Sequence, residues 1–272
     1  MIAALLAGLA ALVLLVWLGL PSLLRAAGLH PHHEIPPFDL SGKRALIVAT
    51  SHDTLGEGGK ATGVAASELT VPFYAFQDAG MTVDIASPKG GAVPVDPSTN
   101  RWPIATDSDR RFERDAEAMR KLTHSLPIAD VDAVAYDVVF LAGGWGAAYD
   151  LGQSAALGEV MTQANANQAV IGGVCHGPLG LLQARDTDGS PLVEGRRVTG
   201  VSDTQVQQLG IEVTPLHPET ELRKAGALYE KETAFRDLFA THVVVDGNLV
   251  TGQNQNSGGE TAHRMLELLA GE

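Results

Sequence analysis

The chain has 272 residues, 45% of them hydrophobic, and its 32 acidic and 19 basic side chains give a formal net charge of −13 at pH 7. No Lys/Arg cluster interrupts this acidity, so the composition excludes a protein that binds nucleic acid through a basic surface. The one cysteine, Cys175, excludes an intramolecular disulfide and a metal knuckle built on paired cysteines.

The first element is an apolar segment, residues 2–24, which carries no charged side chain. As a helix rising about 1.5 Å per residue, it is long enough to cross a hydrocarbon core of roughly 30 Å. We expect residues 1–27 to be a transmembrane anchor. A cleaved signal peptide is the alternative, although the apolar run is longer than usual and no Lys or Arg precedes it. Arg25, Lys43 and Arg44 follow the segment, so the positive-inside rule favours a cytoplasmic domain.

Residues 28–42 are rich in Pro and His, a composition that cannot continue a helix. We interpret them as a linker. His30, His32 and His33 could bind a metal, but a solvated spacer beside a membrane has the same composition more often, and we assign no metal.

Short β-branched runs then alternate with longer amphipathic stretches. We expect strands at 44–50, 81–87, 137–144 and 169–174, and helices near 65–79, 108–122 and 153–166 and from His176 onward. The last third adds a strand at 198–200, a hairpin at 242–252 that turns at Asp246-Gly247, and a helix near 257–270. This alternation predicts one α/β domain, residues 43–272, with a mostly parallel sheet covered on both faces.

The strongest local pattern is AVIGGVCHGP, residues 169–178. A buried strand runs directly into Cys175, and Gly177 and Pro178 then open a helix, as in a nucleophile elbow. A helix N-terminus stabilises a thiolate, and its N–H groups can receive an oxyanion. The alternative is a packed core cysteine, but such a residue needs no elbow around it.

His176 follows the cysteine directly, so it can act as a general base only if the turn swings its ring back toward the sulfur. An elbow permits this geometry, whereas a regular strand would point the two side chains to opposite faces.

GGVCHGP, together with YDVVFLAGGWG at 136–146 and TGVAASELTVPFYAFQDAGMTVDIASPKGG at 62–91, resembles the ThiJ/PfpI family of the class I glutamine amidotransferase-like superfamily. The branch with glyoxalase III and Hsp31-type chaperones is the most similar. The resemblance implies a flavodoxin-like three-layer sandwich, with helices on both faces of a mostly parallel central sheet.

By this resemblance, Glu68 matches a glutamate of the first helix that hydrogen-bonds the cysteine sulfur. A carboxyl group in a partly dry pocket tends to stay protonated and can move a proton. Gly144 matches the glycine whose backbone N–H completes an oxyanion site. Trp145 stands where the family usually has His, so we expect a bulkier and more apolar pocket mouth.

The family also supplies an acidic residue that orients the histidine, from a stretch that reads TGVSDTQV here, residues 199–206. Gln205 and Val206 occupy the glutamate positions, and Asp203 is the carboxylate left nearby. Asp203 either completes a Cys-His-Asp triad or caps the helix near 203–209. In the second case Gln205, a carbonyl or water orients the histidine, with weaker activation.

The resemblance implies a cofactor-independent enzyme that acts on small reactive aldehydes through the Cys175 thiolate. Its chemistry is either of the glyoxalase III type, in which a 2-oxoaldehyde yields a 2-hydroxy acid, or of the deglycase type. A redox-sensing or holdase-type chaperone is the second hypothesis, and amide or peptide hydrolysis is the third. Among partners, the resemblance implies a small aldehyde and a possible homodimer.

Overall fold

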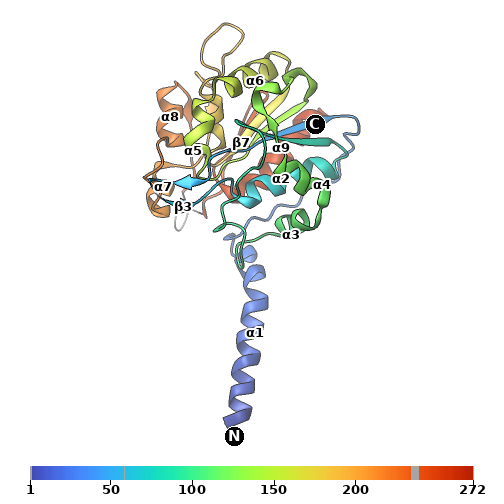
Figure 1. The fold of residues 1–272 in the computed structure, drawn as a ribbon, viewed down its shortest axis with the longest axis vertical. Helices are drawn as coiled ribbons and strands as arrows, with labels where there is room; N and C mark the ends of the chain where they lie inside the picture. Colours follow the sequence, from blue (N-terminus) through green and yellow to red (C-terminus); the bar gives the residue numbers. More distant parts are fainter. Residues whose placement is uncertain (1, 58, 234–238, 272) are drawn as a thin grey trace.

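The computed structural model describes residues 2–57, 59–233 and 239–271. Its central feature is a β-sheet between two layers of helices (Figure 1). In these described residues seven strands form the sheet, in the order β10 (Val243–Asp246), β11 (Leu249–Gly252), β7 (Val170–Val174), β6 (Val138–Leu141), β1 (Arg44–Val48), β4 (Thr82–Ser87) and β5 (Leu126–Pro127).

Every neighbouring pair in this sheet is parallel except β10 and β11, which form an antiparallel hairpin. Numbered along the chain, the inner strands β4, β1, β6, β7 and β11 follow the order 2-1-3-4-5 of flavodoxin-like sheets. The predicted flavodoxin-like α/β fold is confirmed. Ligands of such sheets bind beyond the carboxyl ends of the strands, near the point where the strand order reverses.

Both faces of the sheet are covered because successive side chains of each strand point to opposite sides. Ala45 and Ile47 of β1 pack in a core with α2 and α9, whereas Leu46 and Val48 pack in a second core with α6. The helices of the domain are α2 (Ala66–Asp78), α3 (Asp107–Arg114), α4 (Ala116–Thr123), α5 (Ala147–Asp150), α6 (Ala155–Ala166), α7 (Asp203–Leu209), α8 (Pro218–Lys224) and α9 (Gly258–Ala270).

The single helix expected near 108–122 was wrong, since the structure has two helices there, α3 and α4. The break lies at Asp115, whose backbone is extended (φ −88°, ψ 101°). Its side chain accepts hydrogen bonds from the N–H groups of Glu117 and Ala118, so Asp115 caps a new helix instead of continuing the old one.

The last third of the chain forms the predicted hairpin. Asp246 pairs with Leu249, so the two-residue turn is Gly247-Asn248, one position beyond the expected one. Gly247 has a φ of +57°, which an Asn or Gly residue tolerates best. The expected strand at 198–200 forms β8 (Arg197–Val198), but it pairs with β9 (Leu228–Tyr229) in a separate small sheet. A further small sheet, β2 (Thr54–Leu55) with β3 (Lys60–Ala61), was not predicted.

The apolar N-terminal segment forms a helix, α1 (Ile2–Ala26), that projects from the domain (Figure 1). Its residues Leu5–Ala26 have a mean hydropathy of 2.2 and are long enough to cross a membrane. Residues 28–42 contain no helix or strand, and most of them, including His32 and His33, are exposed. His30 is only 5% exposed, and the backbone N–H of Leu40 donates to the carbonyl of Ala79, so the segment contacts the rest of the chain at these two residues.

Candidate active site

The backbone at Cys175 has the elbow conformation. β7 ends at Val174, and Cys175 follows with a φ of +59°, in the left-handed region that non-glycine residues rarely adopt. The helix expected from His176 is instead a five-residue 3-10 helix, Gly177–Leu181. That prediction was wrong because Gly177, Pro178 and Gly180 are poor formers of an α-helix interior. A helix dipole therefore contributes little at the sulfur.

Close packing around β7 requires glycine. A Cβ on Gly172 would lie 1.9 Å from the carbonyl oxygen of Val250, and one on Gly173 would lie 2.4 Å from that of Leu141. A Cβ on Gly177 would lie 2.1 Å from the same Leu141 oxygen. The glycines of the motif thus let β7 and the elbow approach their neighbours, which holds Cys175 at the sheet edge.

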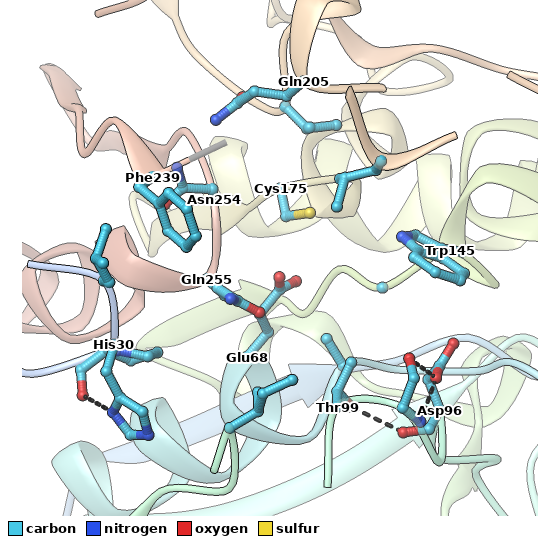
Figure 2. Close-up of a pocket in the computed structure, with 18 of the residues that line it drawn as sticks. His30, Glu68, Asp96, Thr99, Trp145, Cys175, Gln205, Phe239, Asn254 and Gln255 are labelled. Atoms are coloured by element: carbon cyan, nitrogen blue, oxygen red, sulfur yellow. Dashed lines mark hydrogen bonds between the residues drawn. The ribbon is translucent and has the colours of Figure 1, made fainter. Parts of the chain in front are cut away.

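Glu68 and His176 both interact with Cys175. Figure 2 shows Glu68 and Cys175 at the same cavity. The His176 Nδ1 atom lies 3.4 Å from the Cys175 Sγ, so the elbow does turn the ring back toward the sulfur. Glu68 comes from the first turn of α2 and is 2% exposed. Its carboxyl interacts with the Cys175 thiol and with the backbone N–H groups of Gly143 and Gly144.

Burial dominates the ionisation of all three groups. It raises the pKa of Glu68 to about 8, although hydrogen bonds from Cys175 and from the two glycine N–H groups lower it in part. Burial also raises the pKa of the Cys175 thiol well above its usual value, and the Glu68 charge adds to this effect. The pKa of His176 is lowered to about 3 by burial and by His217. At pH 7 the resting site therefore holds a thiol, a carboxylic acid and a neutral imidazole.

These pKa values distinguish the two possible bases. A general base works best when its pKa lies near the working pH. Glu68, with a pKa of about 8, meets this condition, whereas His176, with a pKa of about 3, is too weak to hold a proton. The site favours Glu68 as the group that accepts the thiol proton.

Gly144 has a conformation that other residues cannot adopt there. Its φ is +91°, and a Cβ would lie 2.4 Å from the Ala65 nitrogen and 2.5 Å from the Gly63 oxygen. The backbone N–H groups of Gly144 and His176 act on the Cys175 sulfur and lower its pKa. Two such donors can also stabilise negative charge on an oxygen of a molecule bound at the sulfur.

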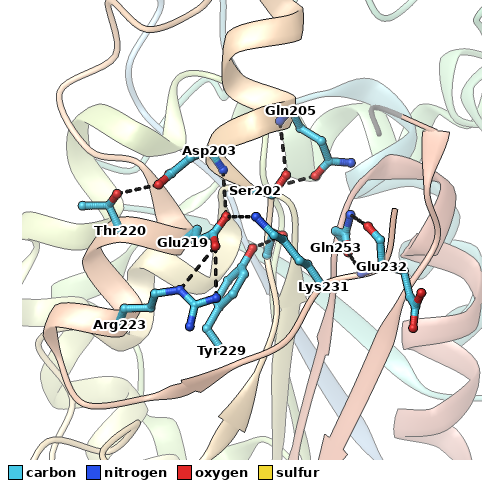
Figure 3. A network of polar contacts seen from close by, with 11 residues as sticks. Ser202, Asp203, Gln205, Glu219, Thr220, Arg223, Tyr229, Lys231, Glu232 and Gln253 are labelled. Carbon is cyan, nitrogen blue, oxygen red and sulfur yellow. Dashed lines mark hydrogen bonds and ion pairs between the residues drawn. The ribbon is translucent and has the colours of Figure 1, made fainter. Parts of the chain in front are cut away.

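The structure does not bring Asp203 to His176. Asp203 is the first residue of α7, its Oδ2 accepts a hydrogen bond from Thr220 (2.7 Å), and its N–H donates to Glu219 (Figure 3). Within the described part of the chain, no hydrogen bond joins Asp203 to His176, and the His176 Nε2 has no partner. The cap of α7 is Ser202 rather than Asp203.

Glu219 is the centre of the network that holds Asp203. It forms ion pairs with Arg223 and Lys231, each at 3.0 Å (Figure 3). A carboxylate 7% exposed with two cationic partners and a backbone donor is well satisfied. The network joins α7 to α8, so the role of Asp203 is structural.

A cavity of about 410 Å³ opens in front of Cys175 (Figure 2). Trp145 lies at this cavity, as expected, and the Lys60 ammonium lies 5.4 Å from the centre of its ring. The other lining residues include Glu68, Asp96, Thr99, Gln205, Leu209, Phe239, Asn254 and Gln255.

Sequence reasoning missed two contributions to this site. His217, the residue before α8, acts on His176 electrostatically, and nothing in its local sequence pointed there. Leu24 and Leu29, at the end of α1 and in the linker, line the cavity. Only the fold brings these distant segments to the elbow.

The comparisons with known proteins agree with this geometry. The sequence profile of the DJ-1/PfpI family matches residues 60–268. The chain is 31% identical over 237 residues to a probable glutathione-independent glyoxalase of Saccharomyces cerevisiae, SNO4, a match that covers 85% of this chain and 99% of that protein. It is 29% identical over 233 residues to glyoxalase 3 of Candida albicans, covering 82% of this chain and 97% of that protein.

Two solved structures are also similar. Glyoxalase III from Candida albicans superposes with a TM-score of 0.76 at 26% identity, covering 82% of this chain and 96% of that chain. The Rapid Encystment Protein 24 kDa of Francisella tularensis superposes with a TM-score of 0.77 at 30% identity, covering 84% of this chain and 99% of that chain. From its profile match, its relatives and its elbow geometry, the chain belongs to the DJ-1/PfpI family.

Proposed function

We propose that this protein is a glutathione-independent glyoxalase, which converts a 2-oxoaldehyde into a 2-hydroxy acid. The observation that carries the proposal is the Glu68 carboxyl, with a pKa of about 8, beside the Cys175 thiol on a strained elbow. Relatives that share most of their length with this chain are named as glyoxalases of this kind.

The first step forms a hemithioacetal. The ionised fraction of Glu68 accepts the thiol proton, and the Cys175 sulfur adds to the aldehyde carbon of R–CO–CHO. The aldehyde oxygen takes the negative charge beside the N–H of Gly144, and then takes a proton from Glu68. The protein's own sulfur thereby occupies the position that a glutathione thiol would otherwise fill.

The second step moves a proton between adjacent carbons. Glu68 removes the proton from the former aldehyde carbon, an enediol forms, and a proton returns to the neighbouring carbon, which leaves a thioester of R–CHOH–CO with Cys175. Water then cleaves the thioester to release R–CHOH–COOH and the free thiol. The net reaction consumes one water and needs no external oxidant or reductant.

The experiment that tests this proposal is lactate formation from methylglyoxal without glutathione. We expect Cys175→Ala to abolish it and Glu68→Gln to lower kcat by roughly 10²–10⁴-fold, the range for loss of a general base. Glu159→Gln, on the exposed side of α6, is the matched control and should behave like the wild type. Lactate formation that persists undiminished in Cys175→Ala would remove the mechanism.

The two alternatives left open by the sequence gain less from the site. Oxidation of a sensor cysteine needs thiolate character and exposure, but Cys175 is 8% exposed and its pKa is raised. Amide hydrolysis needs an acid that protonates an amine, and His176, with a pKa of about 3, is neutral at pH 7. Glu68 would then have to act both as the base for the thiol and as the acid for the amine.

The apolar helix α1 supports a second element of the proposal, a membrane anchor. Eight of its leucines are 55–70% exposed in the described part of the chain, which is expected for side chains that face lipid. The basic residues that follow α1 favour a domain on the cytoplasmic side.

A further inference from the structure

One wall of the active-site cavity comes from outside the α/β domain. Leu24, in the last turns of α1, and Leu29, His30 and Pro31, in the linker, line the same cavity as Cys175. His30 is almost fully buried there, and Figure 2 shows it at the opposite side of the cavity from Trp145. The segment that leads out of the membrane helix therefore borders the catalytic pocket.

Several contacts hold the end of α1 against the domain. The Trp17 ring stacks on the Trp102 ring, with centroids 5.3 Å apart and an interplanar angle of 22°. Arg25 forms an ion pair with Asp107 at 3.2 Å. The carbonyl of Gly28 accepts a hydrogen bond from Asn256. These contacts orient the domain on α1 with its pocket mouth toward the helix end.

This orientation places the mouth at the membrane surface. Trp17 precedes Leu24 by seven residues, so it lies about 10 Å deeper along the apolar helix. Trp102 (41% exposed) stacks on it, and Ile104 (37% exposed) follows Trp102 by two residues on the same loop of the domain. Trp side chains are enriched at the boundary between lipid and water. Ile104 lines the cavity too, so the pocket and the lipid boundary share a wall.

The wall has the chemistry of an alkyl-chain site. Leu24, Leu29 and Ile104 line the side next to α1, and Leu209 and Phe239 continue the apolar lining. A volume of about 410 Å³ falls within the roughly 300–1,000 Å³ of pockets that enclose drug-sized ligands, far more than the three-carbon methylglyoxal fills.

We propose that the substrates are 2-oxoaldehydes, R–CO–CHO, whose R group is an alkyl chain that enters from the bilayer surface and lies against Leu24, Leu29 and Ile104. This inference rests on the proposed function and on the retention of α1. The alkyl chain of the substrate takes no part in the bond changes, which are those of the glyoxalase reaction with one water consumed. Its burial supplies binding energy, and the reacting carbons remain at Cys175.

The first test measures chain-length dependence with the full-length protein in phosphatidylcholine vesicles. The substrates are methylglyoxal, 2-oxohexanal and 2-oxooctanal. We expect kcat/KM to rise about fourfold for each added CH2 until the cavity is full, the factor that corresponds to about 0.8 kcal/mol per buried CH2. If methylglyoxal turnover requires Cys175 but kcat/KM stays flat or falls with chain length, the inference is overturned and the proposed function stands. If no 2-oxoaldehyde is turned over, both are overturned.

The second test removes the apolar wall. Leu29→Ser should lower the ratio of kcat/KM for 2-oxooctanal to that for methylglyoxal by about tenfold, because part of a leucine side chain no longer contacts the alkyl chain. Ile104→Ser provides a second variant of this test in case Leu29→Ser does not fold. Its position is more exposed, and it should lower the same ratio. Leu23→Ser is the matched control, since Leu23 is 64% exposed. An unchanged ratio in both wall variants contradicts the proposal.

The third test separates entry from the bilayer and entry from water. 2-Oxohexadecanal is placed either in the vesicles that hold the protein or in separate vesicles. We expect faster turnover when substrate and protein share a vesicle. Equal rates would show delivery through water and would overturn entry from the membrane.

Discussion

Three ionisable groups meet at the Cys175 sulfur, and burial keeps each of them neutral at pH 7. The proton must therefore leave the thiol during the attack rather than before it. Glu68 is the group whose pKa suits this transfer. A protonated thiol also oxidises more slowly than a thiolate.

The pH dependence of turnover follows from the pKa of Glu68. A general base acts in its deprotonated form, so kcat/KM for methylglyoxal should rise with pH and level off above about 8. Glu68→Gln should remove this rise. A profile in wild type that is flat from about pH 5 to 9 would contradict Glu68 as the base.

Glu68 should also make stability depend on pH. Its pKa is about 8 in the folded protein against 4.5 as an ordinary carboxyl, so the folded state binds this proton more tightly than the unfolded state. The contribution of Glu68 to stability is therefore largest below pH 4.5, and it is lost as the pH rises to about 8, a change on the order of 5 kcal/mol. In urea unfolding, the free energy of unfolding of Glu68→Gln minus that of the wild type should increase as the pH rises. A constant difference would argue against the raised pKa.

Asp203 provides a negative test at the same scale. Because Asp203 bonds to Thr220 and Glu219, we expect Asp203→Asn to change kcat by less than about threefold, while it loosens the contact of α7 with α8. A loss of about 10²-fold with unchanged stability would instead place Asp203 in a triad.

The elements around the site are short, and glycine sets their spacing. β7 passes so close to β11 and β6 that its central positions have no room for a side chain. The helix after the elbow is a 3-10 helix of five residues, Gly177–Leu181. This packing, rather than a long helix dipole, holds Cys175 in a left-handed conformation.

A substitution in β7 tests this packing. Gly172→Ala would place a Cβ 1.9 Å from the Val250 oxygen, so β11 must move, and we expect a loss of about 1–3 kcal/mol or more in thermal or urea unfolding. Gly258→Ala is the matched control, because nothing lies within 4 Å of its Cβ and its φ of −58° suits alanine. Equal stabilities of the two variants would contradict the packing account.

At the scale of the whole molecule, α1 and the domain form one arrangement in which the helix end borders the active site. If α1 spans a bilayer, the domain lies close to the membrane surface instead of swinging on a long tether. The acidic net charge gives no general attraction to anionic lipids, so under the proposed anchoring α1 and the Trp102 loop would supply the membrane contact.

Membrane insertion of α1 is testable directly. The full chain should stay with membranes after extraction at alkaline pH. Leu12→Arg places a charge near the middle of the helix, at a cost of about 2.5–3.5 kcal/mol, and should release part of the protein. A chain found soluble at full length, or shortened by about 25 residues, would indicate respectively no insertion or signal cleavage.

Alternation of apolar runs and amphipathic stretches determined most strands and helices of this protein, because strands buried on both faces and helices with one apolar face are local patterns. Local chemistry also determined the elbow, since glycines flank Cys175 on the strand side and the helix side. The break at Asp115 depends on capping, and the 3-10 helix depends on residues that disfavour an α-helix, Gly177 and Gly180 among them. A search for hydrophobic periodicity detects neither effect.

Only the tertiary structure decided which groups meet at the sulfur and in what ionisation state. Glu68 was found through resemblance, and His217 and Leu29 were not found at all, because they come from segments far apart along the chain. A pKa depends on how completely a group leaves water, and burial is a property of the assembled fold. For the same reason, the sequence alone determined a membrane-length helix, whereas its contact with the catalytic pocket emerged only from the folded molecule.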